Sequence, residues 1–172
     1  MEDVLKKINS NIEQRIEQEI GSVKIKSYRL AEPVLVRDEE QDLTIPAIVD
    51  DKGECRNVFD NADMNDLVMY HRVTSTSFVA SSGFGSSLDY SKISQISLIV
   101  YGLRKLKKDK VIDSICVELM KTDNVNLNSI DYDAIQILAT EYSGLPYFLT
   151  PDYFLVRINF SLTKNLSTRC KK

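Results

Sequence analysis

Apolar residues recur at every fourth position at the start of the chain, with charged and amide side chains between them. This spacing predicts an amphipathic helix over residues 2–20. Gly21 follows, at the place where a left-handed residue commonly ends a helix. Because a strict four-residue spacing turns the apolar stripe slowly around the helix, we expect this helix to pack across a sheet. The stripe consists of Val4, Ile8, Ile12, Ile16 and Ile20.

Residues 23–78 and 93–101 alternate instead between apolar and polar positions, which is typical of β-strands. The longest alternations predict strands near 67–78 and 93–101. The turn sequence Asp50-Asp51-Lys52-Gly53 predicts a hairpin whose returning strand covers 55–59. Shorter strand-like segments lie at 23–26, 34–36 and 43–49.

The second half of the chain predicts two helices and a final strand. Residues 111–120 have helical spacing, and a second helix is expected near 131–143, with Asp131 as its N-cap. The last strand, near 152–163, should lie inside the sheet or beside the 93–101 strand. This order of elements predicts an α+β fold. We expect a mainly antiparallel sheet with a protruding hairpin or loop, flanked on one face by the N-terminal helix and one or two helices of the C-terminal half.

The length of 172 residues fits one α+β domain over residues 1–166, followed by a polar tail at 167–172. A flexible loop is expected at about 81–92, where serine and glycine surround a single aromatic residue. Gly83, Phe84 and Gly85 are candidate subunit contacts, because Phe84 has no neighbours in the loop to pack against. The lysine and hydroxyl residue of a phosphate-binding loop are missing after these glycines, so we expect no nucleotide there.

The formal net charge of -3 gives no overall attraction to nucleic acid or to an anionic membrane. The three cysteines are far apart and form no Cys-x-x-Cys pair, which favours a reducing compartment over a zinc site or a disulfide framework. No apolar run approaches the roughly 20 residues that a membrane helix needs. The first residues lack the apolar segment of a secretion signal. We therefore expect a soluble, intracellular protein without a cofactor or a small-molecule ligand.

No catalytic or metal-binding motif stands out, so we expect a protein that is not an enzyme. His71 is the single histidine, and we interpret it as a structural residue of a strand. The acidic segment that contains Asp60 and Asp63 lacks the glycine and the closing glutamate of a calcium loop. The alternative is a small intracellular enzyme or ligand-binding protein whose site is assembled from dispersed residues such as Asp60, Asp63, His71 and Arg72.

Five basic residues lie within seven positions after the 93–101 strand. A solvated connection between a strand and a helix is the simplest interpretation, and contact with DNA phosphates is the alternative. No aromatic residue lies within the run, so base stacking is not predicted there. A nucleic-acid-binding accessory protein is therefore a third hypothesis. The DNA-facing candidates are Arg104, Lys105, Lys107, Lys108 and Lys110.

The order of elements resembles the tail-terminator and neck-ring proteins, or head–tail connectors, of tailed bacteriophages. Those proteins begin with an amphipathic helix, build a sheet with a protruding hairpin, and finish with a helix and a long last strand. The segments that carry the resemblance are 66–73, 96–102 and 153–158, with the sequences DLVMYHRV, ISLIVYG and YFLVRI. The likeness covers most of the chain but includes no diagnostic motif.

The resemblance implies a virion structural protein that is assembled in the host cytoplasm. It implies a homo-oligomeric ring, a hexamer or a dodecamer, that joins the head to the tail beside portal, neck or tail proteins. The lumen of such a ring would face DNA, which gives the basic run a role in non-specific DNA contact. The expected partners include no membrane and no small molecule.

Overall fold

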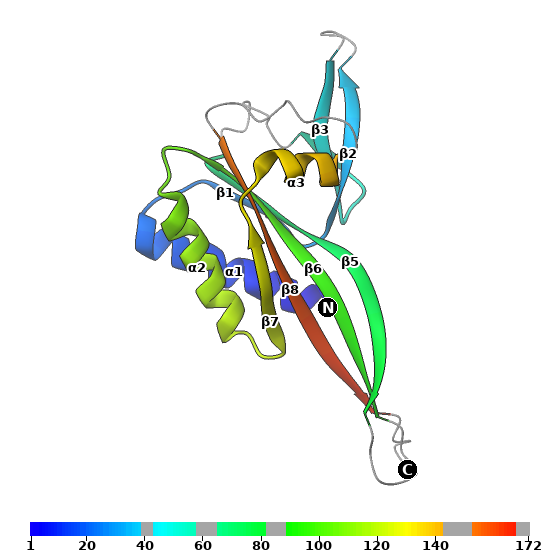
Figure 1. Cartoon of the computed structure of the whole chain (residues 1–172). Helices are drawn as coiled ribbons and strands as arrows, with labels where there is room; N and C mark the ends of the chain where they lie inside the picture. The colour runs from blue at the N-terminus through cyan, green and yellow to red at the C-terminus, as the bar shows by residue number, and fades with distance from the viewer. Residues whose placement is uncertain (39–42, 58–64, 82–88, 143–152, 168–172) are drawn as a thin grey trace.

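The computed structural model describes residues 1–38, 43–57, 65–81, 89–142 and 153–167. Three helices and eight strands lie within these ranges (Figure 1). The helices are α1 (Glu2–Ile20), α2 (Lys108–Lys121) and α3 (Ala134–Glu141). The strands are β1 (Ile25–Tyr28), β2 (Ala31–Asp38), β3 (Leu43–Asp50), β4 (Cys55–Asn57), β5 (Leu67–Ser81), β6 (Asp89–Leu103), β7 (Val125–Asp131) and β8 (Tyr153–Ser167).

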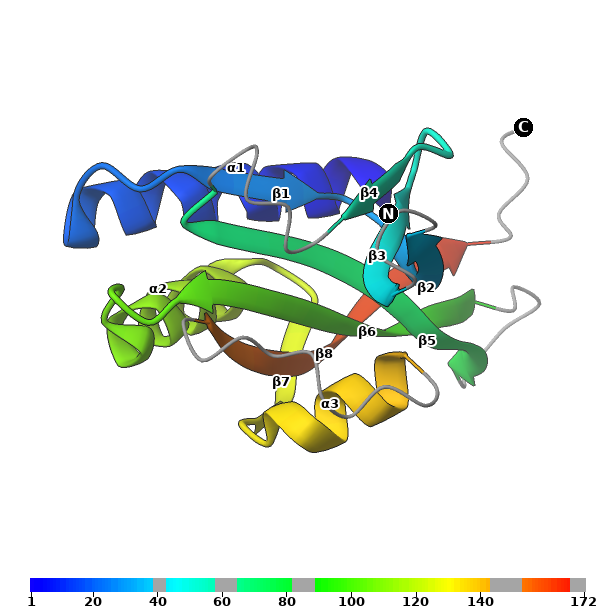
Figure 2. The ribbon, with the colours of Figure 1, turned by 90° about the horizontal axis from the view of Figure 1, so that it is seen from above.

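The strands form two sheets, and the predicted α+β class is confirmed. The main sheet has the order β1-β5-β6-β8-β7, which can be followed from one edge to the other in Figure 2. Its strands are antiparallel except for β1, which runs parallel to β5. The small sheet has the order β2-β3-β4. The last strand of the chain, β8, lies between β6 and β7, so its predicted position inside the sheet is also confirmed.

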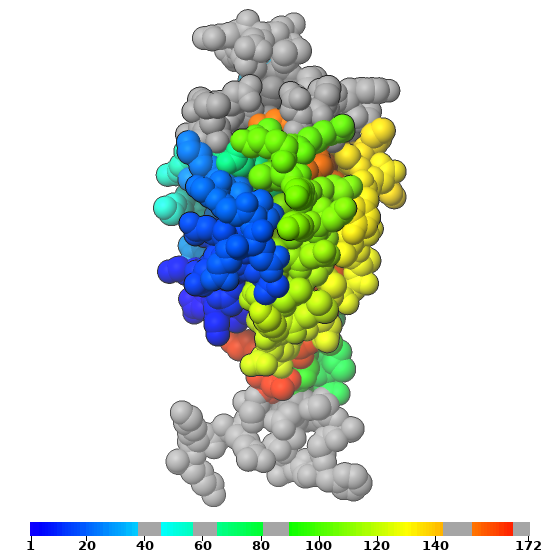
Figure 3. All heavy atoms as spheres, turned by 90° about the vertical axis from the view of Figure 1, so that its left-hand side faces the viewer, coloured from blue at the N-terminus to red at the C-terminus, as the bar shows by residue number. Residues whose placement is uncertain are grey.

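One face of the main sheet is covered by α1 and α2, which lie side by side in Figure 3. The stripe of α1 is buried as predicted at Ile8, Ile12 and Ile16, and Leu5 joins it. On β8 the alternation predicts the buried face correctly. That face consists of Phe154, Val156, Ile158, Phe160 and Leu162.

The opposite face is covered by α3 and by the β2–β3 hairpin, so the expectation that helices cover one face was wrong. Ile137, Leu138 and Tyr142 pack there against the main sheet. The physical reason is that the central strands are apolar on both faces, and a second apolar face must also be removed from water. The sheet residues of this second core are Val68, Tyr70, Ile99, Tyr101 and Leu155.

Three boundaries differ from those expected. Strand β5 continues to Ser81 and β6 begins at Asp89, so the predicted loop at 81–92 is too long, and 82–88 lie outside the described residues. Strand β7 separates the two later helices and was not predicted. Helix α3 is capped by Asp133, whose carboxylate accepts from the backbone N–H groups of residues 135 and 136, and not by Asp131. Strand β8 reaches Ser167, so the polar tail predicted at 167–172 starts no earlier than residue 168. Residues 168–172 also lie outside the described residues.

A three-stranded arm extends beyond the helices. Strands β5, β6 and β8 each contain 15 residues. At about 3.3 Å per residue, each is about 50 Å long. They pass the ends of α1, α2 and β7 at the lower end of Figure 1. A bulge at Thr74, whose hydroxyl donates to the Gln95 carbonyl at 3.2 Å, marks where β5 enters the arm. We call residues 75–81, 89–94 and 162–167 the arm.

Candidate functional site

The single histidine lies in the core and away from solvent. His71 is fully buried, and its ring meets Phe160 edge-to-face with 5.9 Å between the ring centroids. Its Nδ1 lies 3.4 Å from the Tyr28 carbonyl oxygen, which also accepts from the Asn9 amide at 3.3 Å. Burial lowers the pKa of His71 from 6.5 to about 4, so the ring is neutral at physiological pH.

The structure does not bring together the residues of the dispersed-site hypothesis. His71 and Arg72 are neighbours on β5, and their side chains therefore point to opposite faces of the sheet. His71 contacts the core beneath α1, whereas Arg72 pairs with Glu141 of α3. Asp60 and Asp63 lie outside the described residues. In the part of the chain that is described, no group of three or more His, Cys, Asp or Glu side chains could hold a metal ion.

A network of charges holds α3 against the sheet. The side chain of Glu141 is only 2% exposed and lies 2.9 Å from the guanidinium of Arg72 and 3.5 Å from that of Arg157. Arg157 also binds Asp131 at 2.8 Å, and Arg72 lies 3.4 Å from Glu32. Each buried or half-buried charge is therefore paired, as a low-dielectric site requires. We interpret this network as structural.

The basic run connects β6 to α2 at the end of the sheet opposite the arm (Figure 1). Lys105 forms an ion pair with Asp66, and its ammonium lowers the pKa of that carboxyl group. Arg104 donates from Nε to the Tyr153 carbonyl at 3.3 Å. The ammonium of Lys108 lies 5.3 Å from the centre of the Tyr132 ring. Lys107 and Lys110 are exposed.

The run borders a groove that contains aromatic residues from distant parts of the chain. We call this groove, of about 330 Å³, the basic groove. Tyr132 reaches it from the β7–α3 connection and Tyr153 from the start of β8, so neither could be placed beside the run by sequence spacing. No aromatic residue lies within the run itself, but the fold brings Tyr132 and Tyr153 from other segments beside it. The lining residues are Arg104, Leu106, Lys108, Tyr132, Ala134, Tyr153, Phe154 and Leu155.

The arm exposes apolar side chains on both faces. Residues 74–80 of β5 are all exposed. Phe78 is 64% exposed and Val79 is 49% exposed, and as adjacent strand residues they point to opposite faces. A phenylalanine exposed to this extent is unusual unless another surface covers it.

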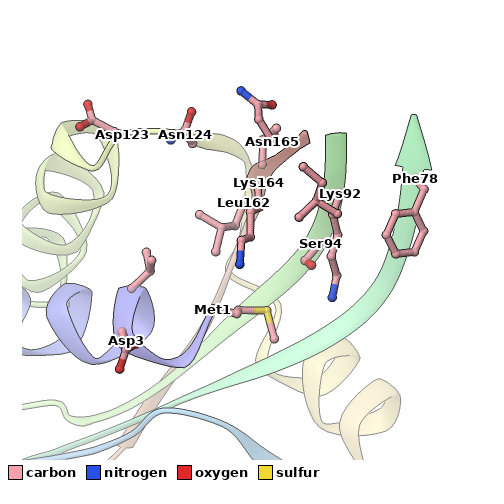
Figure 4. A pocket seen from close by; sticks show the side chains of 13 residues that line it. Met1, Asp3, Phe78, Lys92, Ser94, Asp123, Asn124, Leu162, Lys164 and Asn165 are labelled. Carbon is pink, nitrogen blue, oxygen red and sulfur yellow. The ribbon is translucent and has the colours of Figure 1, made fainter. Parts of the chain in front are cut away.

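A hollow of about 740 Å³ lies where the arm leaves the helices (Figure 4). Its side chains come from the start of α1, the α2–β7 turn and the three arm strands. Lys92 stands directly between Phe78 on β5 and Lys164 on β8 in the strand register. Like charges in directly opposite positions repel each other. The hollow therefore combines an aromatic ring with two adjacent positive charges, and the carboxylates of Asp3 and Asp123 also line it.

The predicted subunit-contact residues, Gly83, Phe84 and Gly85, lie outside the described residues. No helix within the described ranges is long and apolar enough to span a membrane.

The chain matches no protein-family model. No curated protein matches its sequence either.

Proposed function

We propose that this chain is a structural subunit that assembles with copies of itself through the arm, as a ring of the kind found in the neck or tail of tailed bacteriophages. The observation that carries the proposal is the exposed arm, with Phe78 at its helix-side face. As a part of such a particle, the chain would act in the virion beside portal, neck or tail proteins, after assembly in the host cytoplasm.

The arm contributes little stability on its own and should contribute more when another surface covers it. Three strands need an apolar face that is covered before they contribute stability. On the arm, Phe78 and Val79 remain in water, whereas burying each would contribute roughly 1.5–3 kcal/mol. A neighbouring subunit that covers one face would supply this stabilisation.

The charges on the helix-side face favour a head-to-tail contact over a two-fold one. A two-fold contact whose axis passes close to Lys92 and Lys164 would place these lysines of one copy near the same lysines of the other. The repulsion between them would oppose the contact. A contact between this face and a different surface of the next copy avoids the repulsion. Contacts of that kind close into rings when the rotation between copies closes.

The proposal is tested by measuring the mass of the protein in solution by light scattering, with negative-stain imaging of the same sample. We expect a closed oligomer for the wild type. Phe78→Asp should shift the mass toward the monomer and leave the melting temperature unchanged, because Phe78 contacts little of its own subunit. Val79→Asp is the matched control, since it introduces the same charge at the adjacent residue on the opposite face.

Two results would contradict the proposal. The first is a wild-type protein that stays monomeric over the whole accessible concentration range. The second is an oligomer whose mass is unchanged in both arm variants. If Val79→Asp alone disrupts the oligomer, the contact uses the other face of the arm, and the argument from Lys92 and Lys164 no longer applies.

A further inference from the structure

Positive charges that have no carboxylate partner among the described residues lie in and next to the basic groove. Among the described residues, no carboxylate forms an ion pair with Arg104, Lys107, Lys108 or Lys110, whereas Lys105 is neutralised by Asp66. These four cations outnumber the one carboxylate within the same seven residues, that of Asp109, and so produce a local positive potential on a chain whose formal net charge is -3. Positive charge is therefore concentrated at the basic run, where it would attract an anionic ligand.

The groove also offers an aromatic surface to a ligand. Tyr132 is 53% exposed, although a tyrosine ring gains stability from burial. Leu106, Ala134 and Leu155 contribute apolar side chains to the lining of the groove. The ammonium of Lys108 lies over one face of the Tyr132 ring, 5.3 Å from its centre, so a planar group that stacked on the other face would have a positive charge next to it.

We propose that the basic groove binds single-stranded nucleic acid, with a base stacked on Tyr132 and the adjoining phosphates held by the neighbouring lysines. A planar aromatic base and a phosphate follow each other along a nucleic-acid strand, as the tyrosine and the cations do along the groove. An acidic peptide would use the cations and leave the ring without a role. A duplex would use the cations too, but its paired bases could not reach Tyr132.

The size of the groove agrees with a single nucleotide unit. Its volume of about 330 Å³ lies at the lower end of the range for small-ligand sites, roughly 300–1,000 Å³. A longer strand would continue over the exposed lysines outside the groove. This inference is independent of the arm contact, since a monomer would carry the same groove.

The test is the fluorescence anisotropy of a labelled oligothymidylate, titrated with the full chain at several salt concentrations. We expect binding that weakens as salt rises. The double variant Lys107→Ala/Lys108→Ala should lower the slope of log K against log salt by about 1.4, at about 0.7 for each lost phosphate contact with a single strand. Tyr132→Ala should weaken binding about fivefold to a hundredfold, and Tyr132→Phe should bind like the wild type.

Two matched controls separate the groove from general effects. Lys6→Ala/Lys7→Ala removes the same charge from the exposed start of α1, and Met120→Ala removes an apolar side chain that is 61% exposed on α2. Both controls should leave the affinity within about twofold of the wild type, because neither removes a contact of the groove. Thermal melting by circular dichroism checks that all variants fold.

Three outcomes would overturn the proposal. One is an equal loss of affinity in the groove variant and in the Lys6/Lys7 control, which would mean that only net charge matters. Another is normal binding by Tyr132→Ala, which would remove the stacked base. The third is displacement of the oligothymidylate by oligoglutamate at equal charge concentration, which would assign the groove to acidic peptides.

Discussion

Acidification should destabilise this protein through a fully buried residue, His71. The pKa of His71 falls from 6.5 to about 4 because the imidazolium ion would have to be buried. In the unfolded chain the ring regains its ordinary pKa. Between these two values the unfolded state binds a proton that the folded state does not. Stability is therefore fully present above about pH 6.5 and is lost as the pH falls toward 4.

The size of the effect follows from the difference between the two pKa values. A difference of about 2.5 pH units corresponds to about 3 kcal/mol in total. About 2 to 3 kcal/mol of this should be lost between pH 7.5 and pH 4.5. A domain of this kind has only about 5–15 kcal/mol of stability in total, so the loss is measurable by urea unfolding.

The variant His71→Leu isolates this contribution. It removes the titrating ring and keeps an apolar side chain of similar size beside Phe160, and the Tyr28 carbonyl retains its hydrogen bond from Asn9. The carboxyl groups whose pKa values are lowered by their partners, Asp66 and Glu118, destabilise both proteins alike at acid pH. Between pH 7.5 and pH 4.5, the unfolding free energy of the wild type should therefore fall by about 2 to 3 kcal/mol relative to that of His71→Leu. Parallel pH profiles for the two proteins would refute the reasoning.

Two further substitutions test the packing on either face of the sheet. Arg157→Ala removes a partner of the buried Glu141 and of Asp131, and it should lower the free energy of unfolding in urea by about 3 kcal/mol. The control is Arg56→Ala. Arg56 forms an exposed ion pair with Glu54, so its removal should cost less than about 1 kcal/mol. Equal losses would contradict the structural role of the network. Gly102→Ala should lower stability by about 1–3 kcal/mol, because an added methyl group would overlap the Phe154 ring and a methyl group of Leu67. An unchanged urea midpoint in this variant would show that β6 and β8 can separate at this end.

The fold could largely be predicted because its main elements have regular periods. The four-residue stripe of α1 and the alternation of β8 each identified a buried face correctly. Strand β7 was not predicted because its register shifts between Leu127 and Ser129, and this shift interrupts the period of two on which strand prediction rests. The cap of α3 was misplaced for a related reason. The segment Asp131-Tyr132-Asp133 offers two equivalent caps, and β7 continues through the first of them.

The two candidate surfaces, the arm and the basic groove, were harder to predict from the sequence than the fold. Phe78 and Val79 look like core residues of a strand, since the sequence does not tell how far a strand extends beyond the helices that cover it. The basic run was visible, but its aromatic neighbours were not. Tyr132 and Tyr153 reach Lys108 and Arg104 through the pairing of β6, β8 and β7, which is a property of the topology.

The arm and the basic groove lie at opposite ends of the same strands, and their functions should therefore be separable. In the register of β6 and β8, Leu103 pairs with Tyr153 beside the groove, and Asp89 pairs with Ser167 at the tip of the arm. About 50 Å of sheet lies between the two ends, so Phe78→Asp should not change the affinity for an oligonucleotide that occupies one subunit. A strand long enough to reach several subunits should lose affinity in this variant, because assembly supplies the effective concentration for each further contact. Lys107→Ala/Lys108→Ala should weaken both oligonucleotides and leave the mass of the assembly unchanged. If Phe78→Asp weakens the short oligonucleotide as strongly as the long one, the groove is complete only in the assembled protein, and the independence argued here is wrong.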